Sequence, residues 1–140
     1  MISVSIIAKD KSVILPSCLE SVRQVSDDVV IITNADHQFV NFADQKNFAA
    51  NKCKNNWVIS LDADEELSPE LISELKTLDY KRFAAFRIPR INIIFGKEMR
   101  HTNWEPSADT HIWLYDKTRG HWESPVHEEI VISGPVGQLR

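Results

Sequence analysis

Residues 57–66 read Trp57-Val58-Ile59-Ser60-Leu61-Asp62-Ala63-Asp64-Glu65-Glu66, an apolar run that ends directly at four acidic residues. The apolar part is typical of a strand covered on both faces. In open α/β sheets, ligands bind outside the carboxyl ends of such strands. The position of the carboxylates therefore predicts a binding site immediately after this strand.

The carboxylates also indicate the chemistry of that site. Clustered negative charges repel one another unless a cation lies between them, and hard oxygen ligands suit Mg²⁺ or Mn²⁺, which a diphosphate can share. We therefore expect Asp62 and Asp64 to bind a divalent metal that neutralises charge on a departing diphosphate. The alternative is a solvated acidic turn before the next helix. Glu65 and Glu66 suit that second role, as charges at the start of the helix, better than metal binding.

The chain before this strand reads as β-loop-α-β. Residues 2–7 and 29–32 are β-branched, apolar runs that predict buried strands. Between them, residues 13–22 are predicted to form a helix, with Ser12 as its N-cap and Pro16 in its first turn. This order builds a parallel sheet through a right-handed crossover.

Two further helices and three short strands are predicted. One helix covers residues 42–53, and another begins at Ser68-Pro69-Glu70, where a serine cap precedes proline and an acidic first turn. The helix that begins at Ser68 is predicted to run to about Leu78. Its expected buried stripe consists of Leu71, Ile72, Leu75 and Leu78. The later strands are expected at residues 83–88, 111–115 and 129–132, after which no further strand is predicted.

Composition limits the function classes. A chain of 140 residues with 43% hydrophobic and 26% charged residues suits one domain with a real core. A net charge of −4 argues against a nucleic-acid partner. Cys18 and Cys53 are expected to be buried thiols in a reducing compartment. Neither a signal peptide nor an apolar run long enough for a membrane span is present, so we expect a cytoplasmic protein.

Several segments, taken in order, resemble family 2 glycosyltransferases, and in particular the bacterial subgroup that adds glucose or related sugars to the lipopolysaccharide inner core. Each segment is weakly specific alone, but their shared order covers almost the whole chain. The segments are Ile2-Ser3-Val4-Ser5-Ile6-Ile7-Ala8-Lys9-Asp10-Lys11, Phe42-Ala43-Asp44-Gln45-Lys46-Asn47-Phe48-Ala49, the acidic stretch 57–66, Arg87-Ile88-Pro89-Arg90-Ile91-Asn92, Pro125-Val126-His127-Glu128 and Gly134-Pro135-Val136-Gly137.

The resemblance implies an α/β fold of the GT-A type, a Rossmann-like nucleotide-diphospho-sugar transferase fold with a mostly parallel sheet flanked by helices. Residues 1–140 would form a single, abbreviated domain, with a nucleotide-binding half at 1–80 and an incomplete acceptor-side half at 81–140. The implied activity is metal-dependent, inverting transfer of a hexose from a UDP-sugar, with glucose or galactose, to a surface glycan such as the lipopolysaccharide core. Peripheral contact with the inner face of the cytoplasmic membrane would follow from a glycolipid acceptor.

The resemblance also implies roles for individual residues. Lys46 stands where the family more usually has arginine. Lysine keeps the positive charge but cannot make the bidentate hydrogen bonds of a guanidinium group. Two carboxylates, Glu128 and Asp109, are candidates for the catalytic base that takes the acceptor proton. Implied nucleotide contacts are Lys9, Asp10, Asp36, Gln45, Lys46, Asn47 and Asp62. Implied ligands of Mn²⁺ or Mg²⁺ are Asp62, Asp64 and His127.

The chain departs from the family pattern in two places. Only residues 33–41 join the second strand to the next helix, where relatives have a further helix and strand, and relatives continue beyond residue 140 with another strand and C-terminal helices. The missing element would expose a strand edge, so we expect a homo-oligomer. These departures favour an alternative reading, a remnant of the fold that binds nucleotide or a partner without turnover. A nucleotidyltransferase is a weaker alternative, because residues 8–14 lack the glycine-rich phosphate loop of that class.

Overall fold

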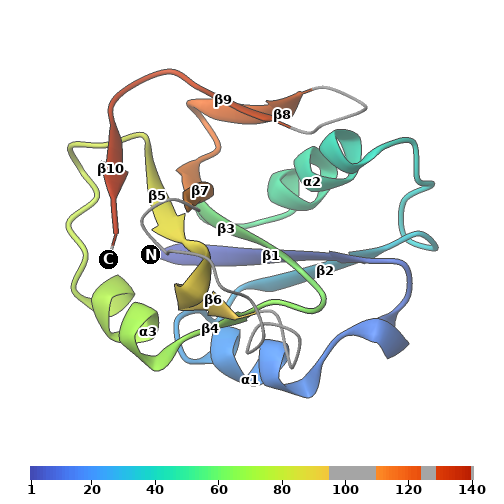
Figure 1. Cartoon of the computed structure of the whole chain (residues 1–140). Helices are drawn as coiled ribbons and strands as arrows, with labels where there is room; N and C mark the ends of the chain where they lie inside the picture. The colour runs from blue at the N-terminus through green and yellow to red at the C-terminus, as the bar shows by residue number, and fades with distance from the viewer. Residues whose placement is uncertain (95–109, 124–128, 140) are drawn as a thin grey trace.

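In a computed structural model of the chain, residues 1–94, 110–123 and 129–139 are described. A six-stranded sheet in the order β10-β5-β7-β3-β1-β2 forms the centre of the molecule (Figure 1). β1 pairs in parallel with β2 and β3, β10 pairs in parallel with β5, and β7 runs antiparallel between β3 and β5. The strands are β1 (Ile2–Ala8), β2 (Val29–Thr33), β3 (Trp57–Asp62), β5 (Ala85–Pro89), β7 (Thr110–Asp116) and β10 (Val136–Gln138). The predicted α/β class with a mostly parallel sheet is confirmed.

Two layers cover the sheet. Helices α1 (Pro16–Arg23) and α3 (Pro69–Lys76) pack on one face and share the largest hydrophobic core with it. Helix α2 (Phe42–Asn51) and a hairpin of two strands cover the other face, where they build a second, smaller core (Figure 1). The hairpin consists of β8 (Gly120–Glu123) and β9 (Glu129–Ile132). A short pair, β4 (Glu66–Leu67) with β6 (Ile93–Ile94), lies outside the main sheet.

The central strands form where the apolar runs predict them. Val4 of β1 is opposite Ile59 of β3, and Ile59 is in turn opposite Leu114 of β7. All three side chains are fully buried, as expected for strands with both faces covered. The predicted cap of α3 is also confirmed, because the Ser68 hydroxyl accepts a hydrogen bond of 3.1 Å from the Leu71 amide.

The predicted start of the first helix is wrong. Helix α1 begins at Pro16, because the residue before a proline is driven out of the helical region, and Leu15 is accordingly extended at φ −67° and ψ 135°. Ser12 is not its cap. A separate 3₁₀ turn, η1 (Lys11–Val13), comes first, and Asp10 caps that turn by accepting a 2.8 Å hydrogen bond from the Ser12 amide.

Strand β2 is the last strand at one end of the sheet order. No strand pairs with its outer side in the part of the chain that the structure describes. Cys18 and Cys53 are buried free thiols, as predicted, and burial raises their pKa to about 12 and about 11. None of the described helices is long and apolar enough to cross a membrane.

Candidate functional site

The carboxyl ends of β1 and β3 meet at one edge of the sheet and open onto a pocket of about 460 Å³. This volume lies within the range of small-molecule sites in proteins. The turn after β2 and the first turn of α2 close the pocket. Its polar lining consists of Lys9, Asn34, Gln45, Asp62 and Asp64. Four predicted site residues, Lys9, Gln45, Asp62 and Asp64, are thus brought around one pocket from three separate parts of the sequence.

Asp62 and Asp64 form the acidic side of this pocket. Asp62 is the last residue of β3, and both side chains are exposed. Ala63, which lies between them, is fixed to the start of α1, because its carbonyl accepts a 3.1 Å hydrogen bond from the Leu15 amide. The turn that carries the two carboxylates is therefore held against α1 and is not a free loop.

Glu65 behaves differently from the two aspartates. The interpretation of Glu65 as a solvated charge at the start of the helix is wrong, since its side chain is only 2% exposed. Its carboxylate accepts a 2.7 Å hydrogen bond from the Asp62 amide. Burial, together with the nearby charges of Asp62 and Asp64, raises the pKa of Glu65 from 4.5 to about 8.

This raised pKa predicts how stability depends on pH. Between pH 4.5 and about 8 the folded chain holds a proton on Glu65 that the unfolded chain has released. The free energy of unfolding should therefore fall as pH rises through this window, by at most about 1.4 kcal/mol per pH unit for one proton. Thermal unfolding from pH 5 to 8 should show this slope, and Glu65→Gln, which cannot titrate, should flatten it. An unchanged slope in the variant would contradict the assignment to Glu65.

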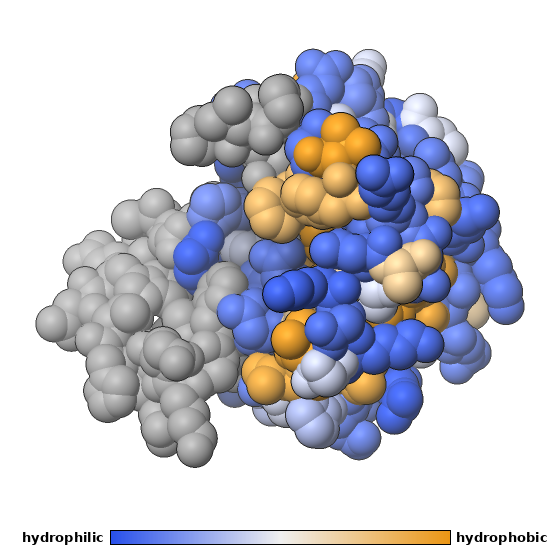
Figure 2. All heavy atoms as spheres, turned by 90° about the vertical axis from the view of Figure 1, so that its right-hand side faces the viewer, coloured by the Kyte–Doolittle hydropathy of each residue, from blue (hydrophilic) through white to orange (hydrophobic). Residues whose placement is uncertain are grey.

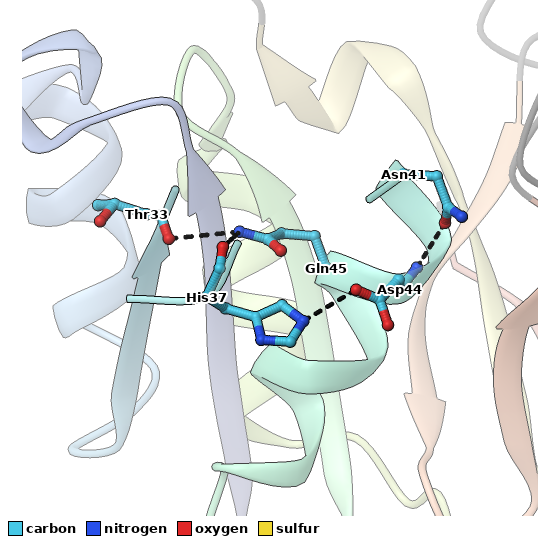
Figure 3. A network of polar contacts seen from close by, with 5 residues as sticks. All are labelled: Thr33, His37, Asn41, Asp44 and Gln45. Carbon is cyan, nitrogen blue, oxygen red and sulfur yellow. Dashed lines mark hydrogen bonds and ion pairs between the residues drawn. The ribbon is translucent and has the colours of Figure 1, made fainter. Parts of the chain in front are cut away.

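Gln45 ties the short connection after β2 to helix α2 (Figure 3). Its amide nitrogen donates to the carbonyls of Thr33 at 3.3 Å and His37 at 3.2 Å. The His37 ring lies 2.8 Å from the carboxylate of Asp44, whose own amide donates to the Asn41 side chain. Gln45 is almost completely buried, and its side-chain oxygen has no hydrogen-bond partner. These contacts fix the wall of the pocket that the connection provides.

Two predicted nucleotide contacts lie in local turns instead of lining the pocket. The Asp10 carboxylate accepts hydrogen bonds from the side chain and backbone of Ser12, which hold the pKa of Asp10 below its ordinary value. The Asp36 carboxylate accepts from the backbone amide and the hydroxyl of Thr33, at 2.9 and 3.0 Å, which lowers its pKa in the same way. Neither side chain is part of the pocket lining.

Lys46 and Asn47 face the β8–β9 hairpin. The Lys46 ammonium lies 4.1 Å from the centre of the Trp122 ring, a cation–π contact. The Asn47 amide pairs with the backbone of Trp122 through two hydrogen bonds of 2.8 Å, one donated and one accepted. The structure therefore places both residues where α2 holds the hairpin, and neither lines the pocket.

The paired hydrogen bonds of Asn47 predict a stability effect. Asn47→Ala removes both bonds and leaves the backbone groups of Trp122 without these partners. We expect it to lower the free energy of unfolding by about 2 kcal/mol, at roughly 1 kcal/mol per bond. Urea unfolding followed by tryptophan fluorescence measures the change. Asn51→Ala, at an exposed position of the same helix, is the matched control. Equal stability of the two variants would show that the pairing contributes nothing.

An aromatic mouth is the feature of the pocket that the sequence reasoning missed. Phe39 and Phe42 remain 40% and 52% exposed and pack edge to face, with ring centres 5.1 Å apart. Both line the pocket, as does the exposed Val13. Figure 2 shows hydrophobic groups at the surface on this side of the molecule. The signal was present in the sequence, because Phe39, Val40 and Phe42 are apolar residues in and beside an otherwise polar connection.

The donor set at the acidic side fits a divalent metal that a diphosphate shares. No group of three or more metal-binding side chains occurs among residues 1–94, 110–123 and 129–139. Two carboxylates, from Asp62 and Asp64, do face the pocket, and Mg²⁺ commonly uses one or two carboxylates together with phosphate oxygens. The other predicted residues, Asp109, His127 and Glu128, lie outside the described residues.

Comparisons with known proteins identify the family to which the chain is similar. The family profile described as Glycosyl transferase family 2 matches residues 6–130. An uncharacterized glycosyltransferase of Rickettsia typhi is 26% identical over 160 positions, covering 96% of this chain and 54% of that protein. A second one, from Rickettsia prowazekii, is 30% identical and covers 69% of this chain and 40% of its own length. The lipopolysaccharide core biosynthesis glycosyltransferase LpsC of Rhizobium meliloti is 30% identical, with 71% of this chain and 37% of LpsC covered.

The matches also show how much of each relative this chain covers. The chain spans about half the length of these relatives or less. The match to the Rickettsia typhi protein covers 160 positions, more than the 140 residues of this chain. That relative therefore contains, within the matched region, residues that have no counterpart here.

Proposed function

Because this chain belongs to glycosyltransferase family 2, we propose that its pocket binds a nucleoside diphosphate sugar and that the domain transfers the sugar to a glycan acceptor. The observation that carries the proposal is the pocket itself. It combines two exposed carboxylates, Asp62 and Asp64, with an aromatic mouth at Phe39 and Phe42. A charged diphosphate and a flat base need these two kinds of surface side by side.

The donor is proposed to be a UDP-sugar, with glucose or galactose as the sugar. The base packs at the mouth, where an aromatic ring offers a stacking surface for any base. Lys9, directly after β1, lines the pocket and would place a positive charge beside the phosphates. Asp62 and Asp64 would hold a Mn²⁺ or Mg²⁺ ion between themselves and the diphosphate. When bound, such a metal stabilises the negative charge of the leaving diphosphate.

The acceptor is proposed to be a surface glycan of the lipopolysaccharide core type. Support comes from the relative LpsC, which is named as a lipopolysaccharide core biosynthesis glycosyltransferase. In an inverting reaction, a carboxylate takes the proton from the acceptor hydroxyl as that hydroxyl attacks the anomeric carbon. Glu128 and Asp109 remain the two candidates for this base. Residues 1–80 would thus bind the nucleotide and residues 81–140 would form the acceptor side.

A second function has its own support. One relative has additional residues inside the matched region, which this chain lacks. This internal difference supports a domain that binds nucleotide and works only with a partner, such as a second copy paired along the outer edge of β2. Turnover of a UDP-sugar by the monomeric chain would exclude this function, and sedimentation velocity would show which oligomer is present.

Calorimetric titration of UDP into the purified protein tests nucleotide binding directly. We expect binding in the presence of Mn²⁺ and loss of most of that binding after addition of EDTA. Uridine, which has the base but no phosphates, is the matched control and should bind weakly in both conditions. If UDP fails to bind with Mn²⁺ and with EDTA alike, the pocket is not a nucleotide site and the proposed function is wrong.

A further inference from the structure

Glu65 makes two contacts with the same residue. Its carboxylate accepts a 2.7 Å hydrogen bond from the amide of Asp62, and its own amide donates a 3.1 Å hydrogen bond to the carbonyl of Asp62. Both backbone polar groups of Asp62 are therefore bonded to Glu65. These two bonds close the turn from Asp62 to Glu65 into a compact ring, with Ala63 and Asp64 at its tip.

The burial of this carboxyl group is unfavourable by itself. Glu65 is 2% exposed and lies close to the negative charges of Asp62 and Asp64. A carboxyl group near like charges is normally more stable in water, and removing it from water is unfavourable unless hydrogen bonds compensate. A neutral side chain could close a turn that only connects β3 with β4. We therefore explain the buried position of Glu65 by the two hydrogen bonds that it makes with the backbone of Asp62.

The neighbours of Glu65 are the two pocket carboxylates. The amide of Asp62 lies at the end of β3, where the strand stops and the turn begins. The hydrogen bond that the Asp62 amide donates to Glu65 holds the backbone of the residue that carries the Asp62 carboxylate. The Ala63 carbonyl, in the same turn, accepts a second hydrogen bond from the Leu15 amide. Together they leave the turn few ways to move, so that Asp62 and Asp64 remain on the pocket side.

We propose that Glu65 is a positioning residue, which holds the Asp62–Asp64 turn in the conformation that presents both carboxylates to the nucleotide and metal. This inference rests on the proposed function for its purpose, but the hydrogen bonds that carry it are independent of any ligand. Glu65 itself is only 2% exposed and does not line the pocket, so its role acts through Asp62 and Asp64.

Three variants separate the hydrogen bond from the charge. Glu65→Ala removes the acceptor of the Asp62 amide. Glu65→Gln keeps an acceptor oxygen at the same place and has the shape of the protonated acid. Glu66→Ala removes the adjacent, half-exposed carboxylate and serves as the matched control for loss of negative charge. Thermal unfolding of each variant identifies any protein that has lost its fold.

The first measurement uses no ligand. Hydrogen exchange followed by NMR at constant pH should show a protected Asp62 amide in the parent and in Glu65→Gln. In Glu65→Ala the same amide should exchange at least about tenfold faster, because its hydrogen bond is gone. Unchanged exchange in Glu65→Ala overturns the inference, whatever the chain binds.

The second measurement is UDP binding with Mn²⁺. Glu65→Ala should bind about 10- to 100-fold more weakly, the usual cost of removing a group that orients a metal ligand. Glu65→Gln and Glu66→Ala should remain within roughly threefold of the parent on the same grounds. A loss in Glu65→Gln as large as in Glu65→Ala overturns the inference, since an acceptor oxygen at this place would then not be enough to preserve binding. A parent that does not bind UDP overturns the proposed function, while the exchange result still decides whether Glu65 holds the turn.

Discussion

Asp64→Ala is expected to abolish metal-dependent UDP binding. Asp64 lies at the tip of the acidic turn, is exposed and lines the pocket, so its carboxylate is available to a metal shared with the diphosphate. Losing one of two protein ligands should weaken binding with Mn²⁺ by at least the roughly 100-fold that loss of an outer partner can cost. Calorimetric titration with Mn²⁺ and with EDTA measures both components.

The control for this variant is Glu70→Ala, which removes an exposed carboxylate from the first turn of α3. It should bind UDP as the parent does. In the presence of EDTA, Asp64→Ala and the parent should differ little, because the aromatic mouth is intact in both. Parent-like binding of Asp64→Ala with Mn²⁺ would show that the metal is held elsewhere or is not used.

Ile59→Ala should have the largest effect on stability. Ile59 is fully buried in β3, with Val4 of β1 on one side and Leu114 of β7 on the other, and its side chain belongs to the larger core. Truncation leaves a cavity in this core, between the sheet and the helices α1 and α3 that pack on it. We expect a loss of about 3–4 kcal/mol in the free energy of unfolding, a large part of the roughly 5–15 kcal/mol of a typical domain.

A graded series tests this prediction in urea. Ile59→Val, which removes one methyl group, should cost about 1 kcal/mol. Val131→Ala, at an exposed position of β9, should stay within about 0.5 kcal/mol of the parent. If Ile59→Ala and Ile59→Val cost the same, the cavity must close by repacking, and the core around β3 is less rigid than the structure indicates.

The sequence predicted the central strands well because their signal is local. Residues 2–7, 29–32 and 57–61 are continuous or nearly continuous apolar runs, and such runs form strands where both faces of a sheet are covered. Strands β8 and β10 were not predicted, because their sequences carry no local strand signal. Gly120-His121-Trp122-Glu123 and Val136-Gly137-Gln138 are short, contain glycine and have no apolar alternation. They form because β9 and β5 offer backbone partners, which a sequence pattern does not reveal.

The sequence predicted where the candidate site lies but not the hydrogen bonds that hold its residues. The strand-end rule placed Asp62 and Asp64 correctly at the edge of the sheet. It could not show that Glu65, only one residue further on, turns inward to meet the Asp62 amide. Nor could it show that the Asn47 amide pairs with Trp122, which is 75 residues away in the chain. Such choices depend on which backbone groups lack a partner in the folded chain.

The hydrogen-bond network around Gln45 should allow a longer segment to be inserted into the connection after β2. Thr33 and His37 are both bonded to Gln45, and Asn41 and Asp44 complete the anchoring on the helix side (Figure 3). Residues 38–40 are not part of this network, so a longer segment inserted there would leave each anchor in place. The entropy of closing a loop grows only slowly with its length, and such an insertion should be inexpensive. A variant that carries a longer segment in place of residues 38–40 would therefore test which properties of the domain depend on this connection.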